Sequence, residues 1–525
     1  MENPYLIAGR DPKRMIVARN EHDEEIVFTI TSKDFVNVQQ FKGLIEGKGN
    51  FIWFGNAQQL AVVKSSLFLE SKTATEIEYL GYNPGFDIYA FSNGVVNGSG
   101  KFSPADENGF CTGGESCYFL PYESKINDED NSFDNFRKFR HATNKQVSWI
   151  KWSKAFVDVY GDNGMIALSF VMAAIFRDII FEHLRFFPHF FLFGPPQSGK
   201  SAISESLQYL FGLPQAPINL EAGSTAVGSF RKLEQFSNAV VAVNEYKNNI
   251  EPKLIGMLKA TYDNQGRETG VMSNDNRTKS SKVRSALLIA GQDLPTNDAA
   301  LFSRLIPIQF VKRDSYTDLE KENFEKLQAI QKGGLTDVLI ELLKQRKYFK
   351  EVFVKYHSDV VKDLKSRYKA RASTERSILN YAIPIAAFKI FNERNFMMPS
   401  TEDRFMAAMY SNFEEYLALL NASTDVSSFW EAFNYLKEKG RITSDRDYAM
   451  KIDAESKVEC ICLRWENIYP EYHRYMSDQR NNPLGKLTLL QYLRNSKEFV
   501  KHGSTDFQGY SRKAHWFRYA HIQSE

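Results

Sequence analysis

Apolar residues occur along this chain in short runs whose spacing predicts alternating strands and helices. Between residues 149 and 184 they recur at helical spacing, which predicts one or two helices ending near Arg185. The runs at 239–245 and 285–291 are almost wholly apolar, as buried parallel strands are. Shorter strand-like runs are expected nearer the N-terminus at 15–18, 25–30, 51–54 and 88–91. The pattern predicts an α/β fold.

A glycine-rich loop links an apolar run to a helix-like segment at residues 190–211, beginning FFLFGPPQSGKS. Its G-x-x-x-x-G-K-[ST] spacing is typical of a phosphate-binding loop, because backbone N–H groups can wrap a phosphate only where side chains do not intrude. Lys200 would reach the β- and γ-phosphates, and Ser201 would place its hydroxyl on Mg²⁺. We therefore expect ATP and Mg²⁺ as cofactors, held by Gly194, Pro195, Pro196, Gln197, Ser198, Gly199, Lys200, Ser201 and Ala202.

Polar residues end the next two predicted strands, where a P-loop NTPase organises Mg²⁺ and the attacking water. The run AVVAVNE ends in Glu245, the candidate catalytic base and a ligand of Mg²⁺ through water. Asn244 precedes it where Asp is usual, and its amide adds no negative charge. The run SALLIAG is followed by Gln292, which could sense the γ-phosphate. The alternative is that Glu245 and Gln292 are ordinary strand-end residues.

Arg304 ends the segment AALFSR, just before the apolar run at 305–310. An arginine at this place in the chain can reach a neighbouring subunit's nucleotide as an arginine finger. A surface salt bridge is the alternative interpretation.

Residues 265–284, QGRETGVMSNDNRTKSSKVR, carry five basic residues against two acidic ones. Ser, Asn and Gly near the middle favour a turn, so the segment is expected to form a hairpin projecting from the ATPase. The candidate DNA contacts are Arg277, Lys279, Lys282 and Arg284. A solvated surface loop remains the alternative.

Several of these segments resemble a known family. The NEYKN, YDNQGRETG and GQDLPTNDAALFSR segments at 244–248, 262–270 and 291–304, together with the phosphate loop, resemble the helicase ATPase of phage and mobile-element primase-helicases. That ATPase is similar to the superfamily-3 and AAA+ helicases. The upstream FSNGVVN and YFLP segments also resemble the part that precedes it.

The resemblance implies a role for each candidate residue. Lys200 and Ser201 would bind nucleotide and Mg²⁺, Glu245 would be the catalytic glutamate, Gln292 the sensor, and Arg304 a finger acting in trans. It also implies a ring, usually hexameric, that moves on single-stranded DNA. The chain carries no zinc-ribbon cysteines and no acidic set for priming, so a separate primase is a possible partner.

We expect four parts along the chain. A mixed α/β domain covers 1–145, the P-loop ATPase 146–310, a helical basic domain 311–422, and a winged-helix-like module 423–525. The basic domain carries lysines and arginines from 341 to 376, which are interpreted either as a solvated face or as a contact for DNA or a neighbouring subunit. The last module ends in QGYSRKAHWFRY, where basic and aromatic residues alternate as in nucleic-acid-binding surfaces, or as in an amphipathic strand.

Composition sets the remaining limits. The chain has 525 residues, of which 43% are apolar and 25% charged, and a net charge of +2, which indicates a globular protein of several domains. Its longest apolar stretch is shorter than the roughly 18 residues of a membrane span, and its N-terminus lacks the order of a signal peptide. Its four cysteines do not have zinc-site spacing. We expect no membrane partner and a cytoplasmic location, in a bacterium or a phage-infected host.

Two functions rival the helicase. The chain could be an ATP-dependent DNA-binding regulator or replication initiator that never translocates, or a small-molecule kinase using the same loop. Arg304 and the appended basic modules argue against the kinase.

Overall fold

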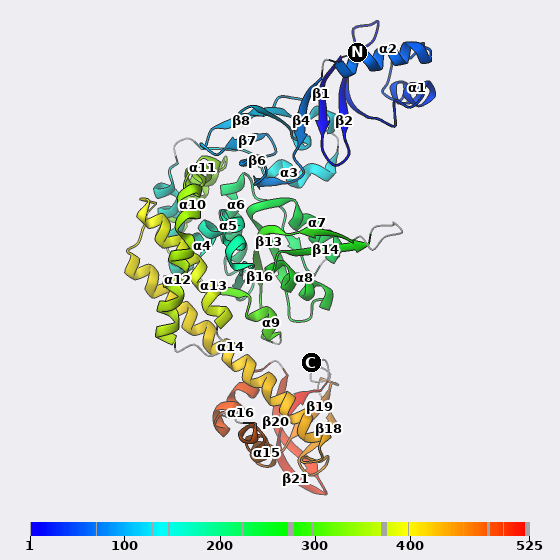
Figure 1. Cartoon of the computed structure of the whole chain (residues 1–525). Coiled ribbons are helices and arrows are strands. Elements are labelled where there is room, and N and C mark those ends of the chain that lie inside the picture. The colour runs from blue at the N-terminus through cyan, green and yellow to red at the C-terminus, as the bar shows by residue number, and fades with distance from the viewer. Residues whose placement is uncertain are drawn as a thin grey trace. The chain divides into compact units, whose positions relative to one another are not determined.

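The computed structural model describes residues 2–69, 71–127, 130–144, 147–221, 225–270, 278–296, 298–368, 375–396, 398–454, 456–479, 483–496 and 498–519. The chain divides into two compact units (Figure 1). The first comprises Met1–Leu294 and Arg304–Asn412, and the second comprises Pro295–Ser303 and Phe413–Glu525.

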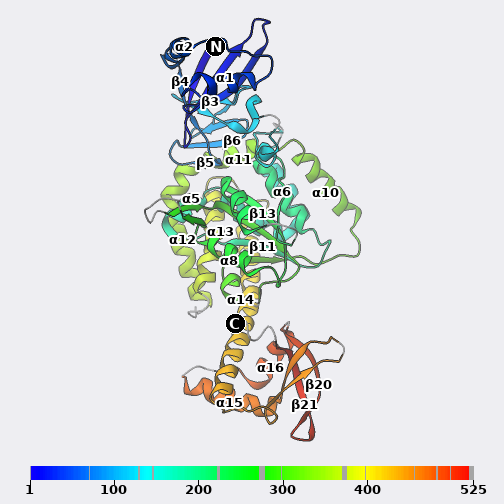
Figure 2. The same ribbon diagram turned by 90° about the vertical axis from the view of Figure 1, so that its right-hand side faces the viewer.

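The first unit begins with a six-stranded sheet in the order β3-β2-β1-β4-β10-β9. Strand β1 pairs antiparallel with β2 and parallel with β4. Helices α1 and α2 lie beside the first strands in both views (Figure 1, Figure 2), and Phe41 and Leu60 from these helices are buried with Phe28 and Ile30 of β3. The bounds are β1 Glu2–Ala8, β2 Lys13–Arg19, β3 Glu25–Thr31, α1 Val38–Glu46, α2 Ala57–Leu69, β4 Lys72–Glu76, β9 Phe110–Gly113 and β10 Ser116–Phe119.

The strand expected at residues 51–54 does not form. These residues connect α1 to α2 without regular structure. Trp53 packs edge-on against Phe41 with ring centroids 5.1 Å apart, and Phe51 is buried. The apolar side chains therefore pack in the cluster formed by α1, α2, β2 and β3 without the segment itself becoming a strand.

The central sheet has nine strands, eight of them in the order β17-β11-β16-β13-β5-β6-β7-β8, with β12 paired to β13. Its first five strands run parallel, and the remaining three follow as an antiparallel meander. Strand β13 is buried along most of its length, as a parallel strand covered on both faces must be. The bounds are β5 Leu80–Asn83, β6 Ile88–Phe91, β7 Gly94–Asn97, β8 Phe102–Pro104, β11 His189–Phe193, β12 Ile218–Asn219, β13 Phe236–Tyr246, β16 Arg284–Gly291 and β17 Leu305–Gln309.

Strands β5 to β8 come from residues 80–104, which the sequence had grouped with the domain 1–145. Phe236 of β13 pairs with Leu80 of β5, and the Leu80 N–H donates to the Gln235 carbonyl at 2.9 Å. Farther along, the buried Tyr89 hydroxyl donates to the Asn238 carbonyl at 3.1 Å. The central sheet therefore extends across the boundary expected at residue 145. The sequence could not predict this, because pairing between segments so distant along the chain leaves no local pattern.

Helices pack on both sides of the central strands. Figure 1 shows α10, α12 and α13 on one side and α7 and α8 on the other. Helix α4 is buried from Gly164 onward, contacts α10 and α13, and is broken at Gly161 by a positive φ of 56°. As the spacing predicted, the 149–184 segment forms two helices, and Arg185 ends the second. The bounds are η1 Pro121–Glu123, η2 Lys125–Asn127, η3 Asn131–Phe133, α3 Asp134–Lys138, α4 Trp149–Ala174, α5 Arg177–Leu184, α6 Lys200–Gln208, η4 Tyr209–Phe211, α7 Ala226–Glu234, α8 Pro252–Tyr262, α10 Asp318–Gln331, α11 Thr336–Leu343, α12 Arg346–Tyr368 and α13 Glu375–Glu393.

In the part of the chain that the structure describes, no single helix is long and apolar enough to cross a membrane. Helices α4 and α5 reach that composition only as a pair, and they are bent by 76° at the break between them.

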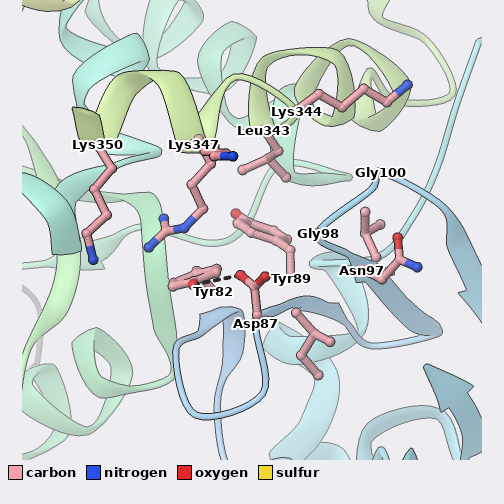
Figure 3. A pocket seen from close by; sticks show the side chains of 13 residues that line it. Tyr82, Asp87, Tyr89, Asn97, Gly98, Gly100, Leu343, Lys344, Lys347 and Lys350 are labelled. Atoms are coloured by element: carbon pink, nitrogen blue, oxygen red, sulfur yellow. Dashed lines mark hydrogen bonds between the residues drawn. The ribbon is translucent and has the colours of Figure 1, made fainter. Parts of the chain in front are cut away.

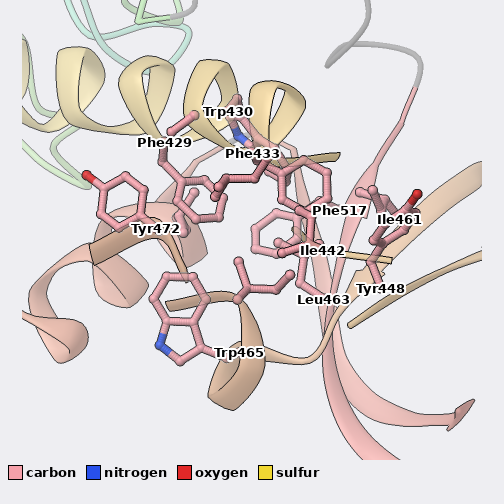
Figure 4. Packing of buried hydrophobic residues seen from close by; sticks show 14 of the residues in the cluster. Phe429, Trp430, Phe433, Ile442, Tyr448, Ile461, Leu463, Trp465, Tyr472 and Phe517 are labelled. Atoms are coloured by element: carbon pink, nitrogen blue, oxygen red, sulfur yellow. The ribbon is translucent and has the colours of Figure 1, made fainter. Parts of the chain in front are cut away.

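The second unit is a small module built on the last turns of α14. Its four strands are antiparallel in the order β18-β19-β21-β20. Figure 4 shows Phe429, Trp430 and Phe433 of α14 packed against Trp465 and Phe517 in its core. The bounds are α9 Ala299–Phe302, α14 Glu402–Glu438, β18 Tyr448–Ile452, β19 Glu459–Leu463, α15 Trp465–Asp478, α16 Lys486–Asn495, β20 Phe499–Phe507 and β21 Tyr510–Arg518, of which α14 begins in the first unit.

Candidate nucleotide-binding site

The glycine-rich loop joins β11 to α6, and two of its glycines have a backbone that side chains disfavour. Gly194 has φ +143°, and a Cβ atom there would lie 2.1 Å from the Phe310 carbonyl oxygen. Gly199 has φ +98° with open space around it. The first glycine is thus required by the close approach of the residue after β17, and the second by its backbone conformation. The sequence pattern alone predicts that both glycines leave room for the phosphate.

Lys200 begins α6 and turns its side chain back over this loop. Its Nζ donates to the carbonyls of Gly194 and Pro195 at 2.8 and 2.7 Å, and lies 3.3 Å from Ser198 Oγ. Burial lowers the pKa of the Lys200 ammonium, and the charge of Glu245 acts in the opposite direction.

The parallel register brings the three predicted strand ends together. Phe193 of β11 pairs with Gly291 of β16, which in turn pairs with Tyr246 of β13. The phosphate loop, Gln292 and Glu245 therefore lie at the same carboxyl edge of the sheet, where ligands of open α/β sheets bind. Gln292, Glu245 and Ser201 are all exposed there.

Asn244 and Glu245 occupy an irregularity in strand pairing. The register of β13 against β16 shifts between Val243 and Tyr246, and Glu245 has a positive φ of 61°. Such irregularities redirect side chains and are common beside active sites. The Asn244 Oδ1 atom is buried without a hydrogen-bond partner, although its backbone carbonyl accepts from the Leu220 N–H at 3.0 Å. An unpaired acceptor at this edge suits a water on Mg²⁺.

The described residues contain no group of three or more His, Cys, Asp or Glu that could hold a metal ion, and all four cysteines are free thiols. Mg²⁺ in NTPase sites keeps several waters and is held by one or two protein groups plus the phosphates of the nucleotide. Ser201 and the exposed carboxylate of Glu245 fit that pattern, with Glu245 acting through water.

Charged residues that the sequence argument did not single out share this edge. Lys247 Nζ lies 2.6 Å from Glu221 Oε1. The hydrogen bond with Glu221 is the main cause that raises the pKa of Lys247, and the charges of Glu245 and Asp293 add to it. Lys247 belongs to the NEYKN segment, and the resemblance of this segment to the helicase ATPase was the sequence signal that could have identified Lys247.

Arg304 lies at the opposite edge of the sheet. Its carbonyl accepts from the His189 N–H at the start of β11, whereas the phosphate loop begins four residues later, after Phe193. At roughly 3.3 Å per residue the two ends are about 13 Å apart. Arg304 forms an ion pair with Asp263 at 3.8 Å and lies over the Tyr262 ring at 5.2 Å. The intrachain salt bridge that the sequence allowed is thus present, and action across a subunit boundary stays a prediction.

The expected basic hairpin is formed by β14 (Gln265–Gly270) and β15 (Thr278–Lys282), which pair antiparallel. Lys279 and Lys282 lie on β15, while Arg277 falls outside the described residues. Arg284 is the first residue of β16 and its guanidinium stacks over the Tyr79 ring at 4.4 Å. Arg284 therefore packs at the base of the sheet rather than on the hairpin.

In the second unit, the basic and aromatic residues of β21 differ in their exposure along the strand. Tyr510, Arg512 and Lys513 are exposed near the turn that joins β20 to β21, whereas Trp516 and Phe517 are buried. The first half of the strand is exposed and basic and most of the second half is buried, so the pattern does not alternate as in an amphipathic strand, and nucleic-acid binding by this segment stays a prediction.

No family model matches the chain, and no curated protein matches it. A solved active helicase, Cch of SCCmec type IV, is similar in structure, with a TM-score of 0.52 and 11% sequence identity. The match covers 100% of this chain and 94% of that one. The two therefore share an overall fold.

Two apo structures of the C-terminal region of NrS-1 are 9% and 10% identical to this chain. They cover 76% and 78% of this chain and 92% and 90% of their own, with TM-scores of 0.27 and 0.30. At those scores we base no conclusion on them.

Proposed function

We propose that the chain is an ATP-hydrolysing DNA helicase or translocase of a phage or mobile-element replication system, acting as a hexameric ring on single-stranded DNA. The observation that carries the proposal is the meeting of the phosphate loop, Glu245 and Gln292 at one edge of a parallel sheet. The likeness in fold to Cch, an active helicase, supports it. The winged-helix-like module, with exposed Arg512 and Lys513, would add DNA contacts, and a separate primase would supply primers.

ATP would supply the phosphoryl group that is transferred to water, with Mg²⁺ on its phosphates. Lys200 would exchange its bonds to the Gly194 and Pro195 carbonyls for bonds to phosphate oxygens. Glu245 would accept a proton from the attacking water, and Gln292 would orient that water. Arg304, about 13 Å from its own chain's loop by strand register, would serve the loop of a neighbouring subunit.

Two variants at this edge test the proposal on a forked DNA duplex. Lys200→Ala should lose both ATP turnover and strand separation, because its amine contacts the phosphates in the ground state. Glu245→Gln should still bind ATP but hydrolyse it about 10²- to 10⁴-fold more slowly, the usual contribution of a general base. Lys332→Ala, an exposed lysine that follows α10, is the matched control and should behave as the parent protein. Normal hydrolysis by Glu245→Gln would overturn the catalytic assignment.

The second candidate is an ATP-dependent DNA-binding regulator or initiator without translocation. It is favoured by the exposed basic end of β21, because a regulator could bind DNA through the second unit alone. Parent protein that binds DNA and hydrolyses ATP but never separates strands would support it.

A further inference from the structure

A second cavity lies in the first unit, apart from the phosphate loop. Its volume is about 440 Å³, within the range of small-molecule sites. Strands β5 to β7 and the turn after β7 form one wall, and the end of α11 with the first turns of α12 forms the other. None of its lining residues belongs to the phosphate loop or to the ends of β13 and β16.

This cavity joins two segments that the sequence had singled out without a shared role. One is the glycine-rich FSNGVVN segment, and the other is the basic run that starts at residue 341. Figure 3 shows Lys347 and Lys350 on the helix side of the cavity and Tyr82, Tyr89 and Asp87 on the strand side, while the Lys344 side chain extends away from these three residues. Gly98 and Gly100 lie in the opposite wall, where a Cβ atom at Gly98 would come within 2.8 Å of Asp87 Oδ2 and one at Gly100 within 2.3 Å of Lys344 Cε.

Two of the four cations in this cavity are already neutralised. Arg346 forms an ion pair with Asp178, with Nη1 and Oδ1 3.0 Å apart, and its guanidinium stacks over the Tyr82 ring at 3.4 Å. Lys350 lies 3.7 Å from Glu182. These two side chains are therefore part of the wall.

The other two cations, Lys344 and Lys347, are exposed and form no ion pair with any residue that the structure describes. Asp87 is the single carboxylate among the described lining residues, and it accepts a hydrogen bond from the Tyr82 hydroxyl at 2.9 Å. The lining thus offers two uncompensated ammonium groups and, across from them, one carboxylate.

We propose that this cavity binds the phosphate of a nucleotide, either a free nucleotide or one within a nucleic-acid strand. Lys344 and Lys347 would bind the phosphate oxygens through charge-assisted hydrogen bonds. Asp87 would accept a hydrogen bond from a sugar hydroxyl or from an N–H group of the base. Inorganic phosphate alone fits less well, because it would offer Asp87 only a second negative charge.

The test uses the full chain carrying Lys200→Ala, so that the phosphate loop contributes little to binding. Two probes distinguish the sources of the phosphate: fluorescent ADP and a short fluorescein-labelled oligo-dT. Lys344→Gln with Lys347→Gln should weaken the binding of at least one probe by about tenfold or more, since two hydrogen bonds to a charged ligand are lost. For oligo-dT the salt dependence should also flatten by about 1.4 log units per log unit of salt.

Lys355→Gln with Lys362→Gln is the matched control, because it removes the same charge from α12 outside the cavity. A loss confined to ADP assigns the cavity to a free nucleotide, and a loss confined to oligo-dT assigns it to a strand. Unchanged binding of both probes, or equal loss in the control, overturns the proposal. The outcome does not depend on whether the phosphate loop hydrolyses ATP.

Discussion

Asn244 and Glu245 are adjacent residues, and each has a feature that lowers the stability of the fold. A non-glycine residue with positive φ costs of order 1–3 kcal/mol, and so does a buried acceptor without a partner. Glu245 has the first feature, with φ +61°, and the Oδ1 atom of Asn244 has the second. Because the two lie at the strand end beside the phosphate loop, we infer that these costs are retained for binding rather than for stability.

Asn244→Asp should therefore tighten the binding of Mg²⁺ at this edge. The substitution keeps the shape of the side chain and adds the negative charge that Asn244 lacks. A charge about 4 Å from an opposite charge is worth about 1 kcal/mol even in a water-like surrounding, or roughly fivefold in affinity. The measurement is the Mg²⁺ concentration that gives half-maximal ATP hydrolysis, which should fall by about that factor.

Asn249→Asp is the control for this prediction, since Asn249 is exposed in the turn after β13. It adds the same charge a few residues away and should leave the Mg²⁺ requirement unchanged. An unchanged or raised requirement in Asn244→Asp would count against a metal-bound water at Asn244.

At the scale of residues, the features that could be predicted from the sequence are those that belong to one contiguous motif. The glycines at 194 and 199 and the lysine at 200 follow from one short pattern. The ion pair of Arg304 with Asp263 could not be predicted, because the two residues are about 40 positions apart and meet only when the strands have formed. Thr488 stands before the apolar run LLQYL, and its residue type and place predict the N-cap of a helix. In the structure α16 begins at Lys486, with Gly485 in the capping position.

The β14–β15 hairpin is the element on which the helicase and the regulator differ. Lys279 and Lys282 lie on its second strand. If they grip single-stranded DNA, Lys279→Ala with Lys282→Ala should flatten the salt dependence of binding by about 1.4 log units per log unit of salt. The same variant should lose strand separation while basal ATP turnover continues.

A second pair of substitutions separates this outcome from the rival function. Arg512→Ala with Lys513→Ala removes the same charge from the exposed end of β21. Should only this pair weaken DNA binding, the hairpin has no role in gripping DNA and the regulator is supported. Lys253→Ala with Lys332→Ala, both exposed, controls for loss of charge alone.

A strand could be predicted from the sequence where its residues form an apolar run and a neighbouring strand is present to pair with it. The apolar runs predicted at 239–245 and 285–291 form β13 and β16, within a few residues of the bounds of these strands. Strand β20 was missed because polar residues fill most of it, and it pairs with β21 across the turn at Gln508 and Gly509, both with positive φ. The joining of β5 to β13 was missed for another reason, because sheet order depends on contacts between distant segments.

At the scale of the whole molecule, Arg304 bears on whether the protein works as a single chain or as an assembly. The parallel register places it beside His189, at the edge opposite the phosphate loop. A guanidinium there cannot reach its own nucleotide without rearrangement of the sheet. If Arg304 takes part in hydrolysis, it must do so at the site of a neighbouring subunit, where such a finger is worth about 10³- to 10⁵-fold in rate.

Mixing two inactive variants tests this directly. Arg304→Ala and Lys200→Ala should each lose ATP turnover alone, but a mixture should regain part of it. In mixed rings, an Arg304→Ala subunit keeps its own Lys200 and meets the intact Arg304 of a Lys200→Ala neighbour, so some interfaces are complete. The measurement is ATP turnover against mixing ratio, with a Lys200→Ala and Glu245→Gln mixture as the control, because both of those changes lie at the same edge of one chain and the recombined interfaces remain defective. If both variants assemble and the mixture stays inactive, Arg304 has a structural role within its own chain, through its ion pair with Asp263 beside the hairpin.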